Sequence, residues 1–158
     1  MPGARLTIGL LIAELNRGFH RAAFFGIAAA AANAGADLIS FDGGLLAAAG
    51  SPETAANVLY DLVGPSVVDG LIIWASALDW NVGAAQTEAF CRRFAPLPVV
   101  TVGRAFAGIP SVLVDNYGGM RAALRHLIEH HGQRRIAFLR GPEGALEEEL
   151  RFQAYCDT

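Results

Sequence analysis

The sequence contains no lysine, and all twelve of its basic residues are arginines. Fifteen acidic residues outnumber them and give a formal net charge of −3, so charge alone does not attract the chain to nucleic acid. The only adjacent arginines are the pairs at 92–93 and 134–135, which we expect at solvated ends of helices or strands. The sequence therefore predicts no direct binding of nucleic acid by this segment.

Cysteine is also scarce, and the two present, Cys91 and Cys156, lie far apart without C-x-x-C spacing. A disulfide or metal framework is not expected from that arrangement. The pair Gly43-Gly44 is not followed by the glycines of a G-x-G-x-x-G fingerprint, and the Walker and G-x-S-x-G motifs are missing. The sequence therefore predicts neither an enzyme nor a bound cofactor.

Two histidines, His126 and His130, lie four residues apart on an expected helix. That spacing can place two imidazoles on one helix face for a metal ion. The segment is not an H-E-x-x-H motif, however, and histidines in the last turn of a helix also suit the helix dipole. We assign no metal site from the sequence.

Long hydrophobic runs are missing too. The most apolar stretch, Phe24–Ala32, stops at Asn33, well short of the ~20 residues that a membrane-spanning helix needs. Residues 1–5 lack the basic region and following apolar run of a signal peptide. We expect a cytoplasmic protein with no membrane contact.

What the sequence does contain is a regular alternation of apolar runs and helix-like segments. The expected strands are 6–12, 37–41, 70–74, 99–102, 111–114 and 135–139, and the expected helices are 19–34, 54–63, 84–94, 116–131 and 147–155. Near-continuous apolar runs are typical of parallel strands that are buried on both faces. The sequence therefore predicts an α/β fold, a parallel sheet with helices on both faces.

Polar and aromatic side chains follow the ends of several expected strands. Open parallel sheets bind ligands at the carboxyl ends of their strands. The candidate ligand-binding residues there are Asn16, Arg17, Asp42, Trp74 and Asp79. An aromatic ring covers the apolar C–H faces of a sugar, while carboxylates and amides bind its hydroxyls. We expect a small polar ligand, with the alternative that Trp74 is a core residue at the end of its strand.

A dense set of motifs lies between residues 97 and 142. They are Pro98-Val-Val, Val114-Asp-Asn, Gly119, His126-Leu, Gly132, Arg135-Ile-Ala and Gly141-Pro142, and Asp69-Gly-Leu-Ile-Ile73 precedes them. In these motifs the chain resembles the sensor domain of lactose/galactose-repressor (LacI/GalR) regulators. Gln133 replaces the family's usual histidine. The segments 40–44 and 109–116 also resemble sensor domains fused to bacterial histidine kinases or diguanylate cyclases.

The resemblance implies a periplasmic-binding-protein-like type I fold, in which two α/β lobes hold a ligand between them. It places the first lobe at residues 1–114, and the crossover and start of an incomplete second lobe at 115–158. We therefore expect the sequence to be truncated or to be completed by another chain. Apolar surface on Ile136, Phe138 or Leu150 should then be exposed or covered by a second chain.

The resemblance also implies a function. Arg151 matches an arginine that reaches the ligand in this family, although Ala154 replaces the glycine that accompanies it. We expect a sensor domain that closes on a sugar-like molecule and regulates a fused or associated signalling or DNA-binding module. One alternative is the effector-binding part of a LacI-type repressor without its DNA-binding domain. Another is a nucleotide-dependent oxidoreductase on a doubly wound sheet, and a homodimer stays open in each case.

Overall fold

The computed structural model describes residues 5–47, 51, 54–141 and 145–158. The chain divides into two compact units, Met1–Leu113 and Val114–Thr158. We refer to them as unit 1 and unit 2. The division falls one residue before the boundary expected from the sequence.

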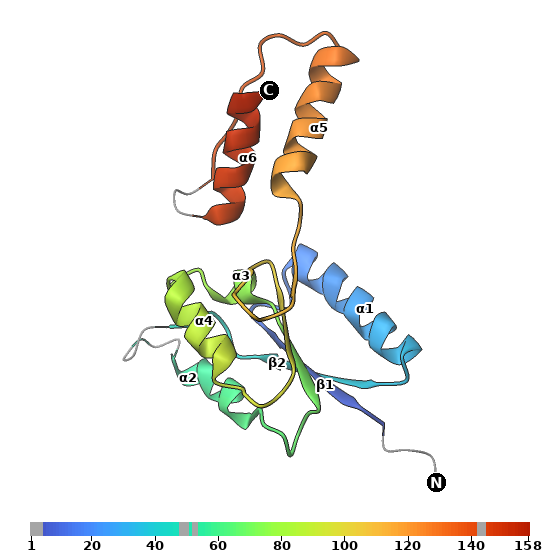
Figure 1. The fold of residues 1–158 in the computed structure, drawn as a ribbon, viewed down its shortest axis with the longest axis vertical. Coiled ribbons are helices and arrows are strands. Elements are labelled where there is room, and N and C mark those ends of the chain that lie inside the picture. The colour runs from blue at the N-terminus through green and yellow to red at the C-terminus, as the bar shows by residue number, and fades with distance from the viewer. Residues whose placement is uncertain (1–4, 48–50, 52–53, 142–144) are drawn as a thin grey trace. The chain divides into compact units, whose positions relative to one another are not determined.

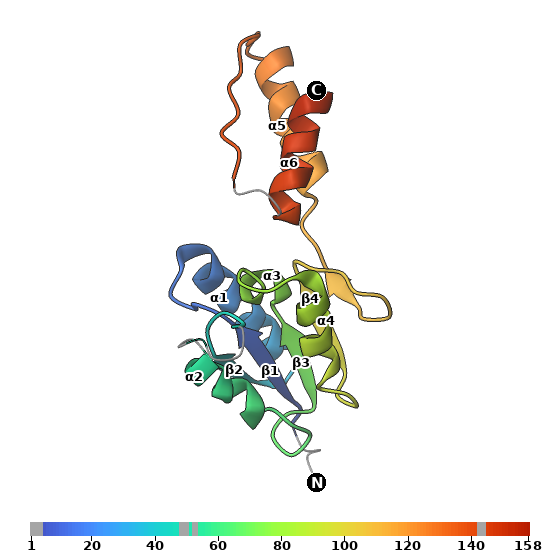
Figure 2. The ribbon, with the colours of Figure 1, turned by 90° about the vertical axis from the view of Figure 1, so that its left-hand side faces the viewer.

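Unit 1 is built on a five-stranded parallel sheet (Figures 1 and 2). Its strands are β1 (Thr7–Ile12), β2 (Asp37–Asp42), β3 (Gly70–Ile73), β4 (Val99–Val102) and β5 (Ser111–Val112), in the order β2-β1-β3-β4-β5. Every pairing is parallel. All carboxyl ends of these strands therefore meet at one edge of the sheet, and the predicted α/β class is confirmed.

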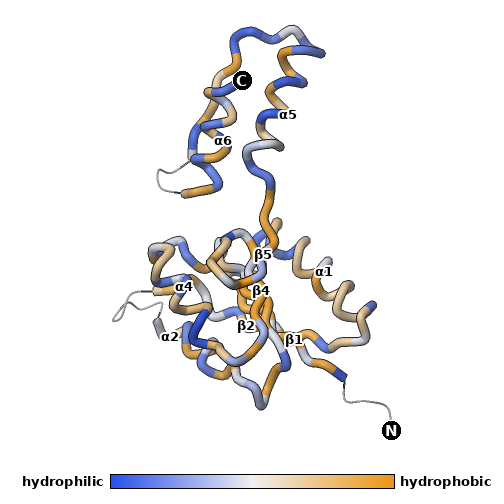
Figure 3. Tube along the Cα trace, in the orientation of Figure 1, coloured by the Kyte–Doolittle hydropathy of each residue, from blue (hydrophilic) through white to orange (hydrophobic). Residues whose placement is uncertain are grey.

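Both faces of this sheet are covered. β1 lies inside the sheet, and its side chains alternate between the faces: Leu10 and Ile12 pack with Trp74 in one cluster. Leu11 packs with Tyr60 in the other cluster. Because successive residues of a strand point to opposite faces, a strand covered on both sides needs an unbroken apolar run. The hydropathy colouring of Figure 3 shows that run along β1 and β4.

The helices of unit 1 divide between the two faces. α1 (Gly18–Asn33) packs on the cluster of Leu10, whereas η1 (Val58–Leu62) and α4 (Ala84–Arg92) contribute to the cluster of Leu11. The short α2 (Thr54–Asn57) runs directly into η1, a 3₁₀ turn. α3 (Ala75–Leu78) is a single turn after β3 that the sequence did not predict, because four residues carry no helical periodicity.

Unit 2 contains two helices, α5 (Asn116–Glu129) and α6 (Leu146–Asp157), which pack against each other. Asp115 caps α5, because its carboxylate accepts a hydrogen bond from the backbone N–H of Gly118 at 2.8 Å. Few residues of unit 2 are buried. Within α5 and α6 the buried residues are Asn116, Leu124 and Ala154.

The prediction of a strand at residues 135–139 is wrong. Residues 133–141 are not paired in a sheet, and Leu139 is 97% exposed. A strand needs a neighbour to bond its backbone N–H and C=O groups, and the described part of unit 2 has no other strand. The apolar run is present, but no strand among the described residues of unit 2 pairs with it.

The apolar surface expected on unit 2 is present in part. Ile136, Phe138 and Leu150 are half-buried. Phe138 stacks on Tyr155 of α6 with 5.0 Å between the ring centroids, and the Tyr155 hydroxyl donates to the carbonyl of Ile136 at 2.8 Å. α6 therefore covers one side of this segment, while Leu139 remains in solvent.

Candidate functional site

Asp42 ties the carboxyl ends of β1 and β2 together. Its two carboxylate oxygens accept hydrogen bonds from the backbone N–H groups of Glu14 (3.0 Å) and Leu15 (3.1 Å). Glu14 has a φ of 55°, in the left-handed region that non-glycine residues seldom adopt. The carboxylate therefore holds the loop after β1 in an otherwise unfavourable turn. Asp42 is exposed, and each oxygen keeps a second lone pair with which it can accept from a ligand hydroxyl.

The loop after β2 is fixed from beneath by two side chains. The hydroxyl of the fully buried Tyr60 lies 2.6 Å from the carbonyl oxygen of Gly44 and 3.1 Å from that of Ile12, and it donates between them. Burial, followed by the negative charge of Asp42, raises the pKa of Tyr60 well above its ordinary value, so the hydroxyl stays a donor. The amide of Asn57 donates to two further carbonyls of the same loop, at 2.7 and 2.8 Å.

An aromatic group lies at the end of β3. Trp74 is only 5% exposed and belongs to the core, in line with its alternative interpretation. Phe19 of α1 lies edge-on against it, with 5.7 Å between the ring centroids, and is 70% exposed. His20 lies 5.1 Å from Trp74, and its Nδ1 is 3.3 Å from the carbonyl oxygen of Glu14. In this group Phe19 offers a ligand far more open aromatic surface than Trp74.

Asp79 forms an ion pair with Arg104. The Arg104 Nε lies 2.5 Å from a carboxylate oxygen of Asp79, and their side chains are 18% and 7% exposed. Asp79 follows α3 and Arg104 follows β4, so the pair links two loops at the carboxyl edge of the sheet. Thr101 of β4 donates its hydroxyl proton to the carbonyl of Arg104 at 2.7 Å, which fixes that loop as well. Asp79 therefore already balances the charge of Arg104 before a ligand binds.

Asn16 and Arg17 lie in solvent at the start of α1. Arg17 is an exposed partner of Glu14, with 2.6 Å between its Nε and the carboxylate. Glu14 in turn links Asp42 with His20, and His20 contacts Trp74. The structure thus brings the predicted residues of β1, β2 and β3 into one connected edge.

Arg151 belongs to unit 2. Its Nε donates to the side-chain oxygen of Asn116 at 2.9 Å, and a terminal nitrogen lies 2.6 Å from the carboxylate of Glu148. Asn116 is the first residue of α5 and is buried. The guanidinium therefore holds the start of α5 against α6, a structural role that the sequence did not suggest.

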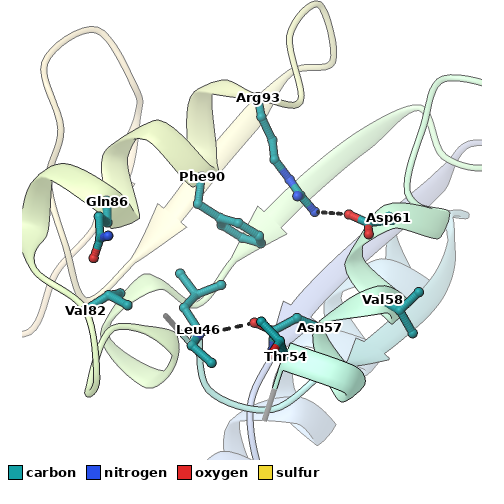
Figure 4. A pocket seen from close by; sticks show the side chains of 10 residues that line it. Leu46, Thr54, Asn57, Val58, Asp61, Val82, Gln86, Phe90 and Arg93 are labelled. Atoms are coloured by element: carbon teal, nitrogen blue, oxygen red, sulfur yellow. Dashed lines mark hydrogen bonds and ion pairs between the residues drawn. The ribbon is translucent and has the colours of Figure 1, made fainter. Parts of the chain in front are cut away.

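A separate pocket of about 490 Å³ opens between the loop after β2, α2 and α4 (Figure 4). Phe90 forms part of its wall, and an ion pair of 3.1 Å between Arg93 and Asp61 closes one side. None of the six predicted residues contributes to it. The pocket is lined by Leu46, Ala47, Thr54, Asn57, Val58, Asp61, Val82, Gln86, Phe90 and Arg93.

Three residues at the carboxyl edge of the sheet were not among the site residues predicted from the sequence: Phe19, His20 and Arg104. Phe19 and His20 lie in the first turn of α1, within the helix expected from the sequence and not in the loop before it. Arg104 was visible as a polar residue after β4, but its pairing with Asp79 depends on how two loops approach each other. Sequence position alone could place these residues at the edge without showing which stay open.

The arrangement suits reversible binding. It offers an open aromatic ring, a carboxylate with free lone pairs and a salt-bridged arginine, which together fit a polar molecule with one apolar face. Among the described residues, no group of three or more His, Cys, Asp or Glu side chains is placed to hold a metal ion. No helix in the same part of the chain is both long and apolar enough to cross a membrane.

A sequence model of the family described as "periplasmic binding proteins and sugar binding domain of LacI family" matches residues 5–158. A comparison with curated proteins gave no significant match.

Solved structures show the same fold. The transcriptional repressor ascG of Escherichia coli is 22% identical with a TM-score of 0.67, over 96% of this chain and 52% of that chain. The trehalose repressor of Escherichia coli is 20% identical with a TM-score of 0.71, over 98% and 55%. A periplasmic binding protein/LacI transcriptional regulator from Alkaliphilus metalliredigens QYMF, complexed with D-xylulofuranose, is 24% identical with a TM-score of 0.65, over 96% and 51%. The chain spans about half the length of these structures.

Proposed function

The chain belongs to the family of periplasmic binding proteins and LacI-type sugar-binding domains, and we propose that it is the effector-binding part of a LacI-type transcriptional regulator. The family match over residues 5–158 carries the proposal. Two of the similar structures are named as repressors, which favours this function over a sensor fused to a kinase or cyclase. A ligand-binding family also favours it over an oxidoreductase.

The proposed ligand is a small polar, sugar-like molecule, and the carboxyl edge of unit 1 is its first contact surface. Phe19 would cover an apolar face of the ligand, because its ring is 70% exposed beside the buried Trp74. Asp42 would accept a hydroxyl hydrogen bond on the lone pairs that the loop after β1 leaves free. Arg104 would donate from its terminal nitrogens while its Nε stays on Asp79.

The other residues predicted from the sequence have smaller roles in the proposed site. Asn16 and Arg17 are exposed at the rim of this edge, and Arg17 would have to leave Glu14 to reach a ligand. Arg151 is retained as the candidate of unit 2, although Asn116 and Glu148 already occupy its guanidinium. Regulation follows if the ligand contacts both lobes of the complete fold, because it then binds the closed arrangement better and increases its population.

We also propose that the chain associates with a second copy of itself. β2 is an edge strand, with Ile39 39% exposed. The neighbouring α1 presents Phe25, 58% exposed, with Arg21 over its ring at 5.9 Å and small apolar residues after it in the helix. Apolar surface of this kind on one helix and one strand edge is typical of association between protein chains. Phe25→Ala should therefore shift a dimer toward monomer in sedimentation equilibrium.

The test is a thermal-shift screen of the protein against monosaccharides, disaccharides and polyols, followed by calorimetric titration with the sugar that raises Tm most. Phe19→Ala should then weaken binding by about 1–2 kcal/mol, roughly five- to thirtyfold in Kd. Phe25→Ala is the matched control, since it removes an exposed phenylalanine from the same helix away from Trp74, and affinity per protomer should not change. Failure of every sugar to bind, or equal losses in the two variants, would count against the proposed site.

A further inference from the structure

Three of the four histidines gather at the carboxyl-terminal end of α5, in unit 2. The imidazole of His126 lies between the other two: the ring centroid of His130 is 5.0 Å away and that of His131 is 4.8 Å away. The Nε2 atoms of His126 and His131 are 3.1 Å apart. All three side chains are exposed, so ions and water reach the cluster from solvent.

The spacing of 3.1 Å is a hydrogen-bond distance, and it also fits two ligands on one metal ion. Zinc binds imidazole nitrogen at about 2.0–2.1 Å, so two nitrogens on a tetrahedral ion lie about 3.3 Å apart. Adjacent nitrogens on a square or octahedral ion lie about 2.9 Å apart at the same bond length. The pair falls between these values, and a small side-chain rotation reaches either of them.

The two nitrogens share one hydrogen bond, so an ion that binds both displaces the proton between them. Glu129 is the nearest carboxylate in sequence, and it is held by Arg125 in an ion pair of 2.8 Å that also balances the arginine's charge. Gln133 reaches only the backbone carbonyl of His131. Imidazole favours zinc, copper and nickel, whereas magnesium and calcium require oxygen ligands.

We propose that His126 and His131 bind a divalent transition metal ion of the zinc, nickel or copper class through their Nε2 atoms. Water fills the remaining coordination positions, and His130 stands beside the ion as a third imidazole. The ion connects the last turn of α5 to the second residue after the helix. It therefore holds the end of this helix through residues that the proposed sugar site does not use.

The test titrates Zn²⁺ alone into the protein prepared without a polyhistidine tag, by calorimetry. One ion per chain is expected. Loss of an outer-shell partner already costs about 10–100-fold in metal affinity, so His126→Ala and His131→Ala should each weaken binding at least tenfold. His20→Ala, which changes the histidine of unit 1, should leave Zn²⁺ affinity unchanged, and Ca²⁺ should not bind.

Thermal melting gives a second readout. Zn²⁺ should raise Tm in the wild-type protein and in His20→Ala, but not in the double variant His126→Ala/His131→Ala, because a ligand stabilises only the state that binds it. His130→Ala should weaken Zn²⁺ binding less than His131→Ala, because only His126 and His131 bring their Nε2 atoms together. Equal Zn²⁺ binding by wild type and double variant, or no binding by either, would overturn the proposed metal site and leave a hydrogen-bonded imidazole pair.

Discussion

Val99–Val102 in unit 1 and residues 135–139 in unit 2 are similar apolar runs, yet only the first is a strand. β4 lies between β3 and β5 and bonds to both. The run in unit 2 has no strand beside it within the described residues, and it rests on the aromatic rings of α6. The comparison shows that an apolar run specifies a strand only where neighbouring backbone is available to pair with it.

The largest expected effect contrasts two leucines that the sequence alone would treat alike. Leu11→Ala empties a fully buried position in β1 and should lower the free energy of unfolding by about 2–5 kcal/mol. Leu139→Ala, at a 97% exposed position, should change it by less than about 0.5 kcal/mol. Urea denaturation followed by circular dichroism measures both. Similar losses would mean that residues 133–141 are packed in solution and would end the contrast.

A second comparison is between two glycines of unit 1, one tightly packed and one with open space around it. A Cβ at Gly43 would lie 2.7 Å from the ring of Tyr60, so Gly43→Ala should destabilise by about 1–3 kcal/mol. Gly26, inside α1, has no atom within 4 Å of a Cβ, and Gly26→Ala should stabilise by about 0.5–1 kcal/mol. Opposite signs in thermal denaturation are expected, and a stable Gly43→Ala protein would contradict the packing of Tyr60.

The polar contacts of the two units can be compared through two asparagines. The side chain of Asn57 makes three hydrogen bonds to the loop after β2, so Asn57→Ala should cost about 1–3 kcal/mol. Asn116 makes two, one of them to the half-exposed Arg151, which water can replace, so Asn116→Ala should cost about 1 kcal/mol. Chemical denaturation of the two variants gives the order. A larger loss for Asn116→Ala would show that the contact between α5 and α6 is the stronger one.

The smallest effect is a pH dependence that arises at Cys91 of unit 1. Burial, with a smaller contribution from Glu88, raises the pKa of the Cys91 thiol from 9.0 to about 11. The folded state then holds this proton more tightly than the unfolded chain does, so its stabilisation is complete below pH 9 and is lost as the pH rises to about 11. Melting curves across this range should fall less steeply in Cys91→Ala. Cys156→Ala, which changes an exposed thiol of unit 2, should follow the wild type.

Much of unit 1 could be predicted because β1, β3 and β4 are apolar runs with buried residues and Gly35 follows the end of α1 with a φ of 70°. The single turn α3 was missed, since four residues are too few to show a period. In the candidate site, sequence position predicted that Asp42, Trp74 and Asp79 lie at the carboxyl edge of the sheet, and the structure has them there. Sequence position could not show that Trp74 is covered while Phe19 is open, because exposure depends on how α1 docks on the sheet.

The alternation of β1 between two faces has a consequence for changes in chain length. Deleting or inserting one residue before Leu10 would send Leu10 and Ile12 toward the helices that now receive Leu11, and the reverse, so both layers would be mismatched at once. Point substitutions disturb one layer and leave the other intact. We therefore expect this strand to tolerate exchanges among apolar residues but no change of length, whereas the loop before α4, exposed at Asn81, should accept added residues.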